Sequence, residues 1–189
     1  NAGAAVARNT ALESASGRYI AFLDGDDVWL PTKLKIQLDY MHKNNATFCF
    51  SAYARVNELN DVICTVGVPL QVTYHELLKT SVIGCLTAIY DTRFFGKVPM
   101  PLTRKRQDFA LWLQLLKRTD CARGIPEVMA LYRVRRGSMS ANKFDAARYT
   151  WNIYRNVEGF GFWRSFYYFA NYGVRGLLRS KFPGPARRL

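Results

Sequence analysis

The chain has 189 residues, of which 49% are hydrophobic and 14% aromatic, so it is long and apolar enough to fold around a core and is not a disordered chain. Its 27 Lys and Arg against 14 Asp and Glu give a net charge of +13, which favours anionic partners such as nucleotides, an acidic lipid surface or nucleic acid. No apolar run approaches the roughly 18 residues of a membrane span, and four scattered cysteines without a Cys-x-x-Cys pair argue against a zinc site and a disulfide framework.

The first predicted elements are a helix over residues 4–16 and a strand over residues 19–23. The helix has a face of small residues and ends near Gly17, which suits the left-handed conformation at a helix C-terminus. Five successive apolar residues predict a short strand that is buried on both faces. A helix leading into a buried strand is the repeating unit of an open α/β sheet, in which ligands bind beyond the carboxyl ends of the strands.

Three carboxylates follow this strand, in the sequence Asp24-Gly25-Asp26-Asp27. Acids so close together raise each other's pKa unless a cation or strong hydrogen-bond donors hold them ionised. Mg²⁺ or Mn²⁺ would supply that charge, and it typically binds one or two protein carboxylates together with phosphate oxygens. The segment therefore indicates a site for a phosphorylated substrate. The alternative is a plain Asp-Gly turn or a helix start at Asp27.

The middle of the chain contains further elements, set off by caps and turns. Thr32 is the predicted N-cap of a helix that ends near residue 44 and has Leu34, Leu38 and Met41 on its apolar face. The other predicted elements are strands over residues 47–53, 62–66, 86–90 and 128–134, a short helix over residues 74–79 capped by Thr73, and a loop over residues 98–106.

A helix over residues 107–116 is predicted from its composition and from the apolar face shared by Leu111, Trp112 and Leu115. Asp108 lies in its first turn, where the helix dipole favours a carboxylate. Asp108 is therefore either a functional acid or a capping residue.

A basic, glycine-containing loop, Arg135–Ser140, precedes the last helices. Backbone amides and side chains of such a loop suit a diphosphate, with Arg136 and Ser138 as the candidate ligands. The alternative is a solvated basic loop.

The C-terminal segment, residues 160–188, is rich in aromatic and basic residues. Because Arg164, Asn171 and Arg175 interrupt it, it does not suit a bilayer span. A helix with aromatic residues on one side and arginines on the other is typical of one that lies on an anionic membrane surface. The alternative is a helix packed on the rest of the chain or on a second subunit.

Taken together, the motifs of residues 1 to about 143 resemble the family 2 nucleotide-sugar glycosyltransferases. The segments that carry the resemblance are Asn1-Ala2-Gly3 with Ala7-Arg8-Asn9, the run from Tyr19 to Trp29, Lys33-Leu34 with Gln37, Gln107-Asp108 with Leu111-Trp112, and Gly137-Ser138-Met139-Ser140. Each motif alone is weak, and the ordered set is strong.

The resemblance implies a GT-A fold, a Rossmann-like α/β sheet that binds a nucleotide-sugar donor through Mn²⁺ or Mg²⁺ and typically inverts the anomeric centre. It also implies roles for single residues. Asp24 would contact the ribose or the metal, and Asp26 with Asp27 would hold the metal on the diphosphate. Asp108 would be the general base, and Arg8 would lie near the nucleotide.

The chain departs from the family pattern in two places. Gln107 stands where the family usually has Glu, which removes a charge beside the base. The strand and the Asp-bearing segment that grip the nucleobase in the family lie upstream of the stretch that matches Asn1. We therefore expect a partial GT-A domain over residues 1–143 that lacks its first strand or strands, and a helical extension over residues 144–189.

The leading hypothesis is a glycosyltransferase that acts on a glycan or a lipid-linked acceptor in bacterial surface polysaccharide synthesis. Such an enzyme would be cytoplasmic, with a peripheral contact to the inner face of the plasma membrane. One alternative is a nucleic-acid-binding module, which the charge of +13 favours and the acidic turn does not. A non-catalytic fragment is another, and a metal phosphohydrolase is disfavoured because added histidine ligands are lacking.

Overall fold

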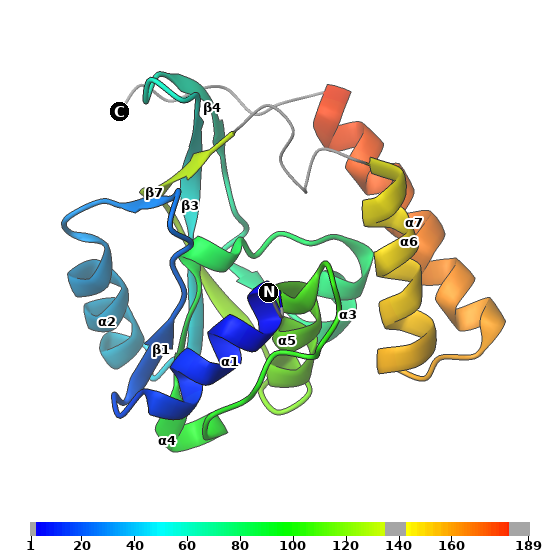
Figure 1. The fold of residues 1–189 in the computed structure, drawn as a ribbon, viewed down its shortest axis with the longest axis horizontal. Coiled ribbons are helices and arrows are strands. Elements are labelled where there is room, and N and C mark those ends of the chain that lie inside the picture. Colours follow the sequence, from blue (N-terminus) through cyan, green and yellow to red (C-terminus); the bar gives the residue numbers. More distant parts are fainter. Residues whose placement is uncertain (1–2, 135–142, 182–189) are drawn as a thin grey trace.

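The computed structural model describes residues 3–134 and 143–181, which form a mixed sheet with helices on both faces (Figure 1). The strand order is β1 (Tyr19–Ala21), β6 (Ile89–Asp91), β3 (Phe48–Val56), β7 (Ala122–Arg133) and β2 (Val28–Trp29). In addition, β4 (Val62–Val66) pairs with β3, and β5 (Gln71–Val72) pairs with β7. Paired strands are antiparallel, except that β3 and β7 are parallel.

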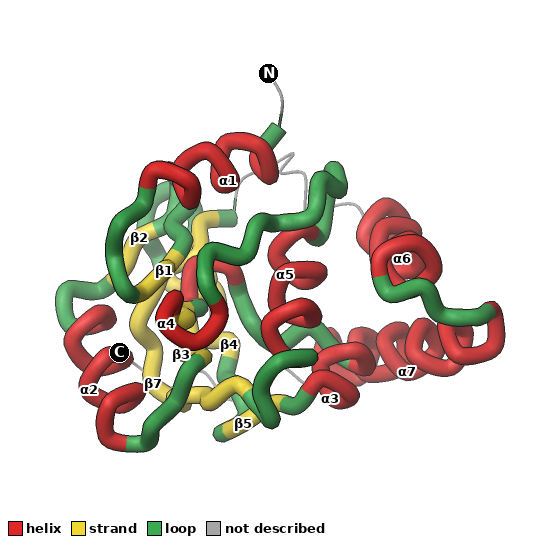
Figure 2. Tube along the Cα trace, turned by 90° about the horizontal axis from the view of Figure 1, so that it is seen from below, coloured by secondary structure: helices red, strands yellow, loops and turns green. Residues whose placement is uncertain are grey.

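Helix α2 (Lys33–Lys43) covers one face of the sheet, while α1 (Ala4–Ser14), α3 (Tyr74–Lys79) and α5 (Gln107–Leu116) lie on the other (Figures 1 and 2). A 3-10 turn (Cys85–Thr87) and α4 (Thr92–Phe95) flank β6. Helix α6 (Lys143–Asn152), a π-helical turn (Ile153–Val157) and α7 (Phe162–Lys181) lie beyond α5, on its side away from the sheet (Figure 2). The α/β sheet and the C-terminal helical appendage expected from the sequence are both present.

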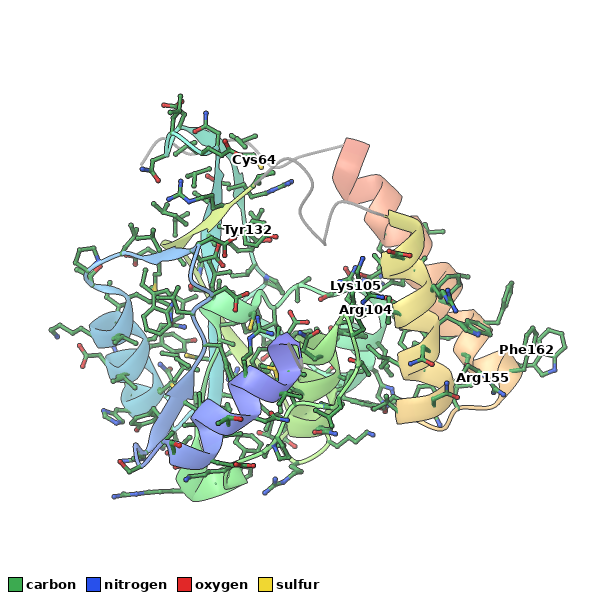
Figure 3. All side chains as sticks on the ribbon, in the orientation of Figure 1. Cys64, Arg104, Lys105, Tyr132, Arg155 and Phe162 are labelled. Carbon is green, nitrogen blue, oxygen red and sulfur yellow. The ribbon has the colours of Figure 1, made fainter. Side chains whose placement is uncertain are left out.

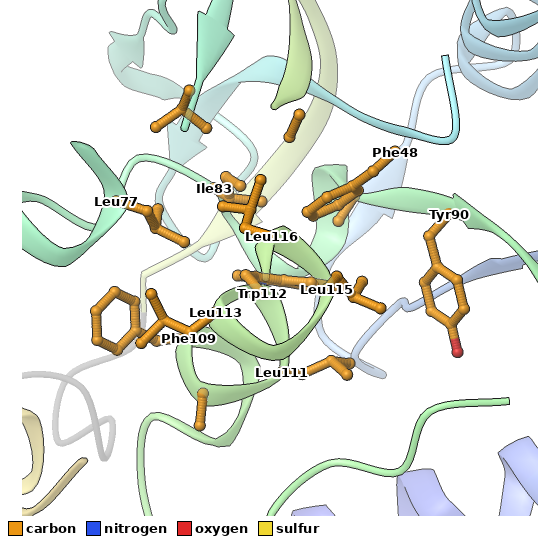
Figure 4. Packing of buried hydrophobic residues seen from close by; sticks show 14 of the residues in the cluster. Phe48, Leu77, Ile83, Tyr90, Phe109, Leu111, Trp112, Leu113, Leu115 and Leu116 are labelled. Atoms are coloured by element: carbon orange, nitrogen blue, oxygen red, sulfur yellow. The ribbon is translucent and has the colours of Figure 1, made fainter. Parts of the chain in front are cut away.

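Most of the core lies between the sheet and α5 (Figure 4). Trp112 of α5 is fully buried, and its ring centroid lies 5.3 Å from that of Phe48 in β3 and 6.0 Å from that of Phe22 after β1. Phe109 contacts Tyr172 of α7 at a centroid distance of 6.4 Å. Helix α5 is therefore covered from two sides, which explains why its sequence is apolar nearly all round.

Three predicted elements, β4, α3 and α5, have the expected bounds. Thr73 caps α3 through a reciprocal pair of hydrogen bonds. The backbone N–H of Thr73 donates to Glu76 Oε2 at 2.8 Å, and the backbone N–H of Glu76 donates to Thr73 Oγ1 at 3.3 Å. This capping box depends on residues three apart, so the sequence alone is enough to predict it.

The strand expected at residues 19–23 is shorter and less buried than its apolar run indicates. Strand β1 ends at Ala21, and Ile20 is its one buried residue. The reason is that β1 lies at the end of the sheet and, among the described strands, pairs with β6 alone. The helix before it also ends early, because Ala15 is extended and Gly17 is not a left-handed cap.

Two later strand predictions also need correction. Residues 86–90 were expected to form a strand, but Cys85–Thr87 is a 3-10 turn and the strand β6 starts at Ile89. Strand β7 starts at Ala122 and passes through Pro126, where the register with β3 shifts from Ser51–Ile125 to Ala52–Val128. Pro126 is tolerated because a bulge needs no backbone N–H in the ladder at that point.

Helix α2 starts after Thr32 as expected, and Leu38 and Met41 of the expected apolar face contact the core, but the helix is rotated so that Leu34 is not buried. Its buried residues are Lys33, Gln37 and Met41, whereas Leu34 is 44% exposed. Gln37 explains the rotation, because its Nε2 donates to a backbone carbonyl in the 3-10 turn before β6 at 2.9 Å. A polar contact with a turn that is distant in sequence therefore rotates the helix away from its apolar pattern.

Lys33 is fully buried, and within the described residues its Nζ has no hydrogen-bond partner. Nζ lies 4.3 Å from the ring centroid of Trp29, a cation–π contact that replaces part of the lost hydration. Burial lowers the pKa of Lys33 to about 8, and the nearby Cys49 thiol opposes this change.

Replacing Lys33 by Met is expected to remove a pH dependence of stability. The folded chain loses the Lys33 proton near pH 8 and the unfolded chain near 10.5, so between these values the unfolded state binds more protons. The free energy of unfolding therefore rises across this window, by about 3 kcal/mol at most, and is flat below it as far as Lys33 is concerned. Urea unfolding at pH 7.5 and 10.5 measures the rise, with exposed Lys43→Met as the matched control. An equal rise in Lys33→Met contradicts this account.

One face of α7 packs on the rest of the chain and the other is exposed. Ser165 and Tyr168 are buried, and the Tyr168 hydroxyl is hydrogen-bonded to His75 Nδ1 of α3 at 2.9 Å. For this face of α7, the alternative prediction of a helix packed on the rest of the chain is therefore correct. Among the described residues we find no helix with the length and hydrophobicity that crossing a bilayer requires.

Candidate active site

A cavity of about 580 Å³ lies where α1, the turn after β1, the start of α5 and the sheet meet. Its lining includes Arg8 from α1, Asp24 and Asp27 from the turn, Asp108 from α5 and Tyr132 from β7. The structure thus brings four of the predicted site residues to one place, although they come from three separate segments of the chain.

The acidic turn, Asp24–Asp27, is anchored by β7. The backbone N–H of Asp27 donates to the carbonyl of Asp24 at 3.0 Å and closes the turn. Arg133 holds it from outside: its backbone N–H donates to Asp27 Oδ1 at 3.0 Å, and its Nε donates to the carbonyl of Asp26 at 3.0 Å. Asp26 itself is half-buried and is not among the residues that line the cavity.

Arg8 forms an ion pair with Asp24, through Nη2 and Oδ1. Burial works against the Arg8 charge, but Cys85, Asp24 and Asp108 together outweigh it and raise the pKa of Arg8. Arg8 is therefore a permanent cation at the cavity wall, next to a carboxylate. This pairing suits a ligand that carries both a phosphate and a metal ion.

Burial raises the pKa of Asp27 to about 6. The neighbouring charges of Asp26 and Asp24 add to this rise, and the N–H of Arg133 opposes it. A divalent cation at this position would favour the ionised carboxylates and reverse the effect of their mutual repulsion.

The described residues contain no group of three or more His, Cys, Asp or Glu side chains placed to hold a metal ion by themselves. Two carboxylates, Asp24 and Asp27, nevertheless share one cavity. Mg²⁺ is usually bound in this way, by one or two carboxylates plus the phosphate oxygens of a substrate, rather than by an all-protein cage. The site therefore fits a cation that arrives with a phosphorylated ligand.

Asp108 is half-buried in the first turn of α5 and lines the same cavity. The N-cap of α5 is Arg106, whose side chain makes no capping hydrogen bond, and Asp108 is the acidic residue of the first turn. Burial raises the pKa of the Cys85 thiol well above its usual range, and the charge of Asp108 adds to this rise. Asp108, Cys85 and Arg8 thus line the same cavity.

Sequence reasoning missed much of the cavity wall. Residues 81–86 form one side, and Tyr53 and Tyr132, whose ring centroids are 6.1 Å apart, form another. No motif marks these residues, because they become neighbours only through strand pairing. Arg104, Lys105 and Arg106 also line the cavity, and their position directly before Asp108 was an available signal. Arg136 and Ser138, the predicted diphosphate ligands, lie outside the described residues.

Comparison with known proteins identifies relatives along most of the chain. TuaG of Bacillus subtilis (strain 168), named a putative teichuronic acid biosynthesis glycosyltransferase, is 43% identical over 180 residues, which cover 95% of this chain and 71% of TuaG. WfgD of Escherichia coli, named a UDP-Glc:alpha-D-GlcNAc-diphosphoundecaprenol beta-1,3-glucosyltransferase, is 38% identical over 181 residues, which cover 95% of this chain and 70% of WfgD.

A solved structure of S. aureus TarS in complex with UDP-GlcNAc has a TM-score of 0.63 and 18% identity to this chain. The match covers 96% of this chain and 55% of the TarS chain, so this chain spans about half of TarS. The likeness confirms the GT-A fold. Residues 1–64 also match the family described as glycosyl transferase family 2. With TuaG 43% identical over nearly the whole length, the chain belongs to the family 2 glycosyltransferases.

Proposed function

We propose that the protein transfers a sugar from a nucleotide-sugar donor to a hydroxyl of a glycan or a lipid-linked glycan. The observation that carries the proposal is that Asp24, Asp27 and Asp108 meet at one cavity beside Arg8. The chemistry needs an acidic group for a cation and a diphosphate, and a separate acid for proton transfer. The names of TuaG and WfgD and the UDP-GlcNAc in the TarS complex support this reaction, in bacterial surface polysaccharide synthesis.

On the donor side, Asp24 would contact the ribose or the cation, and Asp26 with Asp27 would hold the Mn²⁺ or Mg²⁺ that accompanies the diphosphate. A bound cation supplies Lewis-acid stabilisation of the charge on the leaving diphosphate. Arg8, fixed by its ion pair with Asp24, places a second positive charge beside the nucleotide.

On the acceptor side, Asp108 is the general base. A sugar hydroxyl attacks poorly at neutral pH unless a carboxylate takes its proton as the new bond forms. The acceptor oxygen bonds to the anomeric carbon, the bond from that carbon to the diphosphate breaks, and the proton passes to Asp108. A single displacement of this kind inverts the anomeric centre. Gln107, in place of Glu, leaves this base where it is.

Two further assignments extend the proposal beyond the described residues. Arg136 and Ser138 serve as additional ligands of the donor diphosphate, because a basic loop with a glycine suits that group. Residues 1–143 provide the catalytic part of the chain, and residues 144–189 provide a helical extension.

The donor half of the proposal is tested by thermal unfolding with UDP-, GDP- and dTDP-sugars in the presence of Mn²⁺. One nucleotide is expected to raise the unfolding midpoint, because a ligand that binds the folded state stabilises it, and a chelator should remove the effect. Release of free phosphate without an acceptor would instead indicate a phosphohydrolase. Steeply salt-dependent oligonucleotide binding with no response to nucleotide sugars would indicate a nucleic-acid-binding module.

The exposed face of α7 supports a peripheral contact with the inner face of the plasma membrane. Phe162, Trp163 and Phe166 are 54%, 80% and 53% exposed, and Arg164 and Arg175 are exposed on the same helix. Figure 3 shows Phe162 at the outer end of α7, directed away from the rest of the molecule. Exposed aromatic rings beside arginines suit the headgroup region of an anionic bilayer.

Replacing Trp163 and Phe166 together by Ser is expected to lower binding to anionic vesicles by about tenfold or more, because two aromatic side chains no longer enter the lipid interface. Co-sedimentation with phosphatidylserine vesicles at moderate salt measures the change. The control is Leu59→Ser, which removes an 81% exposed apolar side chain elsewhere. Unchanged binding of the double variant would contradict the membrane contact.

A further inference from the structure

Three consecutive cations, Arg104, Lys105 and Arg106, line the cavity directly before the helix that carries Asp108. Figure 3 shows Arg104 and Lys105 between α5 and α6. We call these three residues the basic row. The donor contacts proposed above use the acidic turn and Arg8, so they leave the basic row without a role.

The C-terminal helices hold the basic row in place. Lys105 Nζ lies 2.9 Å from Asp145 Oδ2 of α6, and the Arg106 guanidinium lies over the ring of Tyr172 in α7, with Cζ 5.7 Å from the ring centroid. Arg106 also has φ of 65°, a left-handed conformation that costs a non-glycine residue energy. The packing of α6 and α7 therefore positions cations at the cavity rather than only stabilising the fold.

Within the described residues, one of the three charges of the row is held in an ion pair. Asp145 pairs with Lys105, and no other ion pair joins the row to the part of the chain that the structure describes. Arg104 is exposed at the cavity. Cations that line a cavity and are not held in ion pairs attract anions. The cavity therefore has an acidic end, which needs a cation to accept a phosphate, and a basic end, which accepts a phosphate directly.

We infer that the basic row binds a phosphate or diphosphate group carried by the acceptor. This inference rests on the proposed function, because it assigns the second anion of the reaction to the second charged end of the cavity. Asp108 lies in the first turn of α5, two residues after Arg106, so an acceptor held by its phosphate on the row presents a nearby sugar hydroxyl to the base. The acceptor class is then a sugar joined to a phosphate or diphosphate, rather than a neutral glycan.

Replacing Arg104 by Glu tests the inference, because this side chain is exposed and the described ion pair of Asp145 is with Lys105 and not with Arg104. The KM for a diphosphate-linked sugar acceptor should rise by about tenfold or more, as expected for a lost charge-assisted contact. The KM of the donor, and the KM of the same sugar on a neutral aglycone, should not change. Lys43→Glu, which makes the same charge change on α2 across the sheet, should have no effect (Figure 1).

Two results would overturn the inference. An equal rise in KM for the phosphorylated and the neutral acceptor would mean that the basic row does not bind the phosphate of the acceptor. A rise in the donor KM alone would assign the row to the donor diphosphate.

Binding measurements separate this inference from the proposed function. Calorimetry with inorganic pyrophosphate, with the nucleoside diphosphate and Mn²⁺ at saturation, should show a second site that Arg104→Glu weakens by about tenfold. No second site, or a second site unaffected by Arg104→Glu, would overturn the inference. Neither result would contradict the proposed binding of the nucleotide-sugar donor. If the second site has these properties but the protein transfers no sugar, the phosphate site at the basic row is supported and the proposed transferase activity is contradicted.

Discussion

Replacing Asp108 by Asn is expected to lower the rate of sugar transfer by about 10²- to 10⁴-fold and to leave donor binding intact. The amide has the shape of the carboxylate but cannot accept the proton of the acceptor hydroxyl. Asp108 lines the cavity from the first turn of α5, and that helix is packed between the sheet and the C-terminal helices. The loss should therefore appear in kcat, measured by initial rates, and not in the unfolding midpoint.

The matched control for this variant is Asp120→Asn, an exposed carboxylate after the same helix. It should transfer sugar at the normal rate. Undiminished turnover in Asp108→Asn would remove Asp108 from the role of base. Loss of donor binding would instead assign this side chain to the nucleotide side of the cavity.

Replacing Asp26 by Ala is expected to weaken the metal-dependent binding of the nucleoside diphosphate by about 100-fold or more, since even changes in the outer shell of a metal site cost about 10- to 100-fold. The contact that Arg133 makes to residue 26 is with the backbone carbonyl, which Ala retains. The backbone N–H of Asp27 also still donates to the carbonyl of residue 24, so these backbone contacts of the turn are kept. The loss is expected for binding in the presence of Mn²⁺ or Mg²⁺. Calorimetry with and without a chelator measures it.

A parallel variant, Asp27→Ala, sharpens the test because Asp27 lines the cavity and Asp26 does not. If Asp26→Ala binds normally and Asp27→Ala does not, the cation is held by Asp27. Normal binding in both variants would show that the metal assignment is wrong. Asp39→Ala, which removes an exposed carboxylate of α2, controls for the change in net charge.

Elements whose ends depend on neighbouring residues were predictable. Thr73 and Glu76 form their capping box three residues apart, and α3 has the predicted bounds. Helix α5 likewise begins and ends where its apolar sequence indicates. The acidic turn is recognisable for the same reason, because Asp24 and Asp27 are close in sequence and close a turn by one backbone hydrogen bond.

Elements whose burial depends on distant partners were predicted less well. The spacing of Leu34, Leu38 and Met41 indicates an apolar face, but α2 is oriented by the contact of Gln37 across to the 3-10 turn, which buries Lys33 instead. An apolar periodicity predicts that one face of a helix is buried. It does not predict which polar side chains on or beside that face form hydrogen bonds with distant residues.

By itself the sequence determined the family, the acidic turn after the first strand, and the helix that carries Asp108. Only the tertiary structure decided that Asp24, Asp27 and Asp108 share one cavity, and that Arg104 and Lys105 line it as well. The physical reason is that strand pairing and the packing of Trp112 against the sheet bring these segments together. Such contacts between distant parts of a chain leave no local sequence pattern from which a site could be predicted.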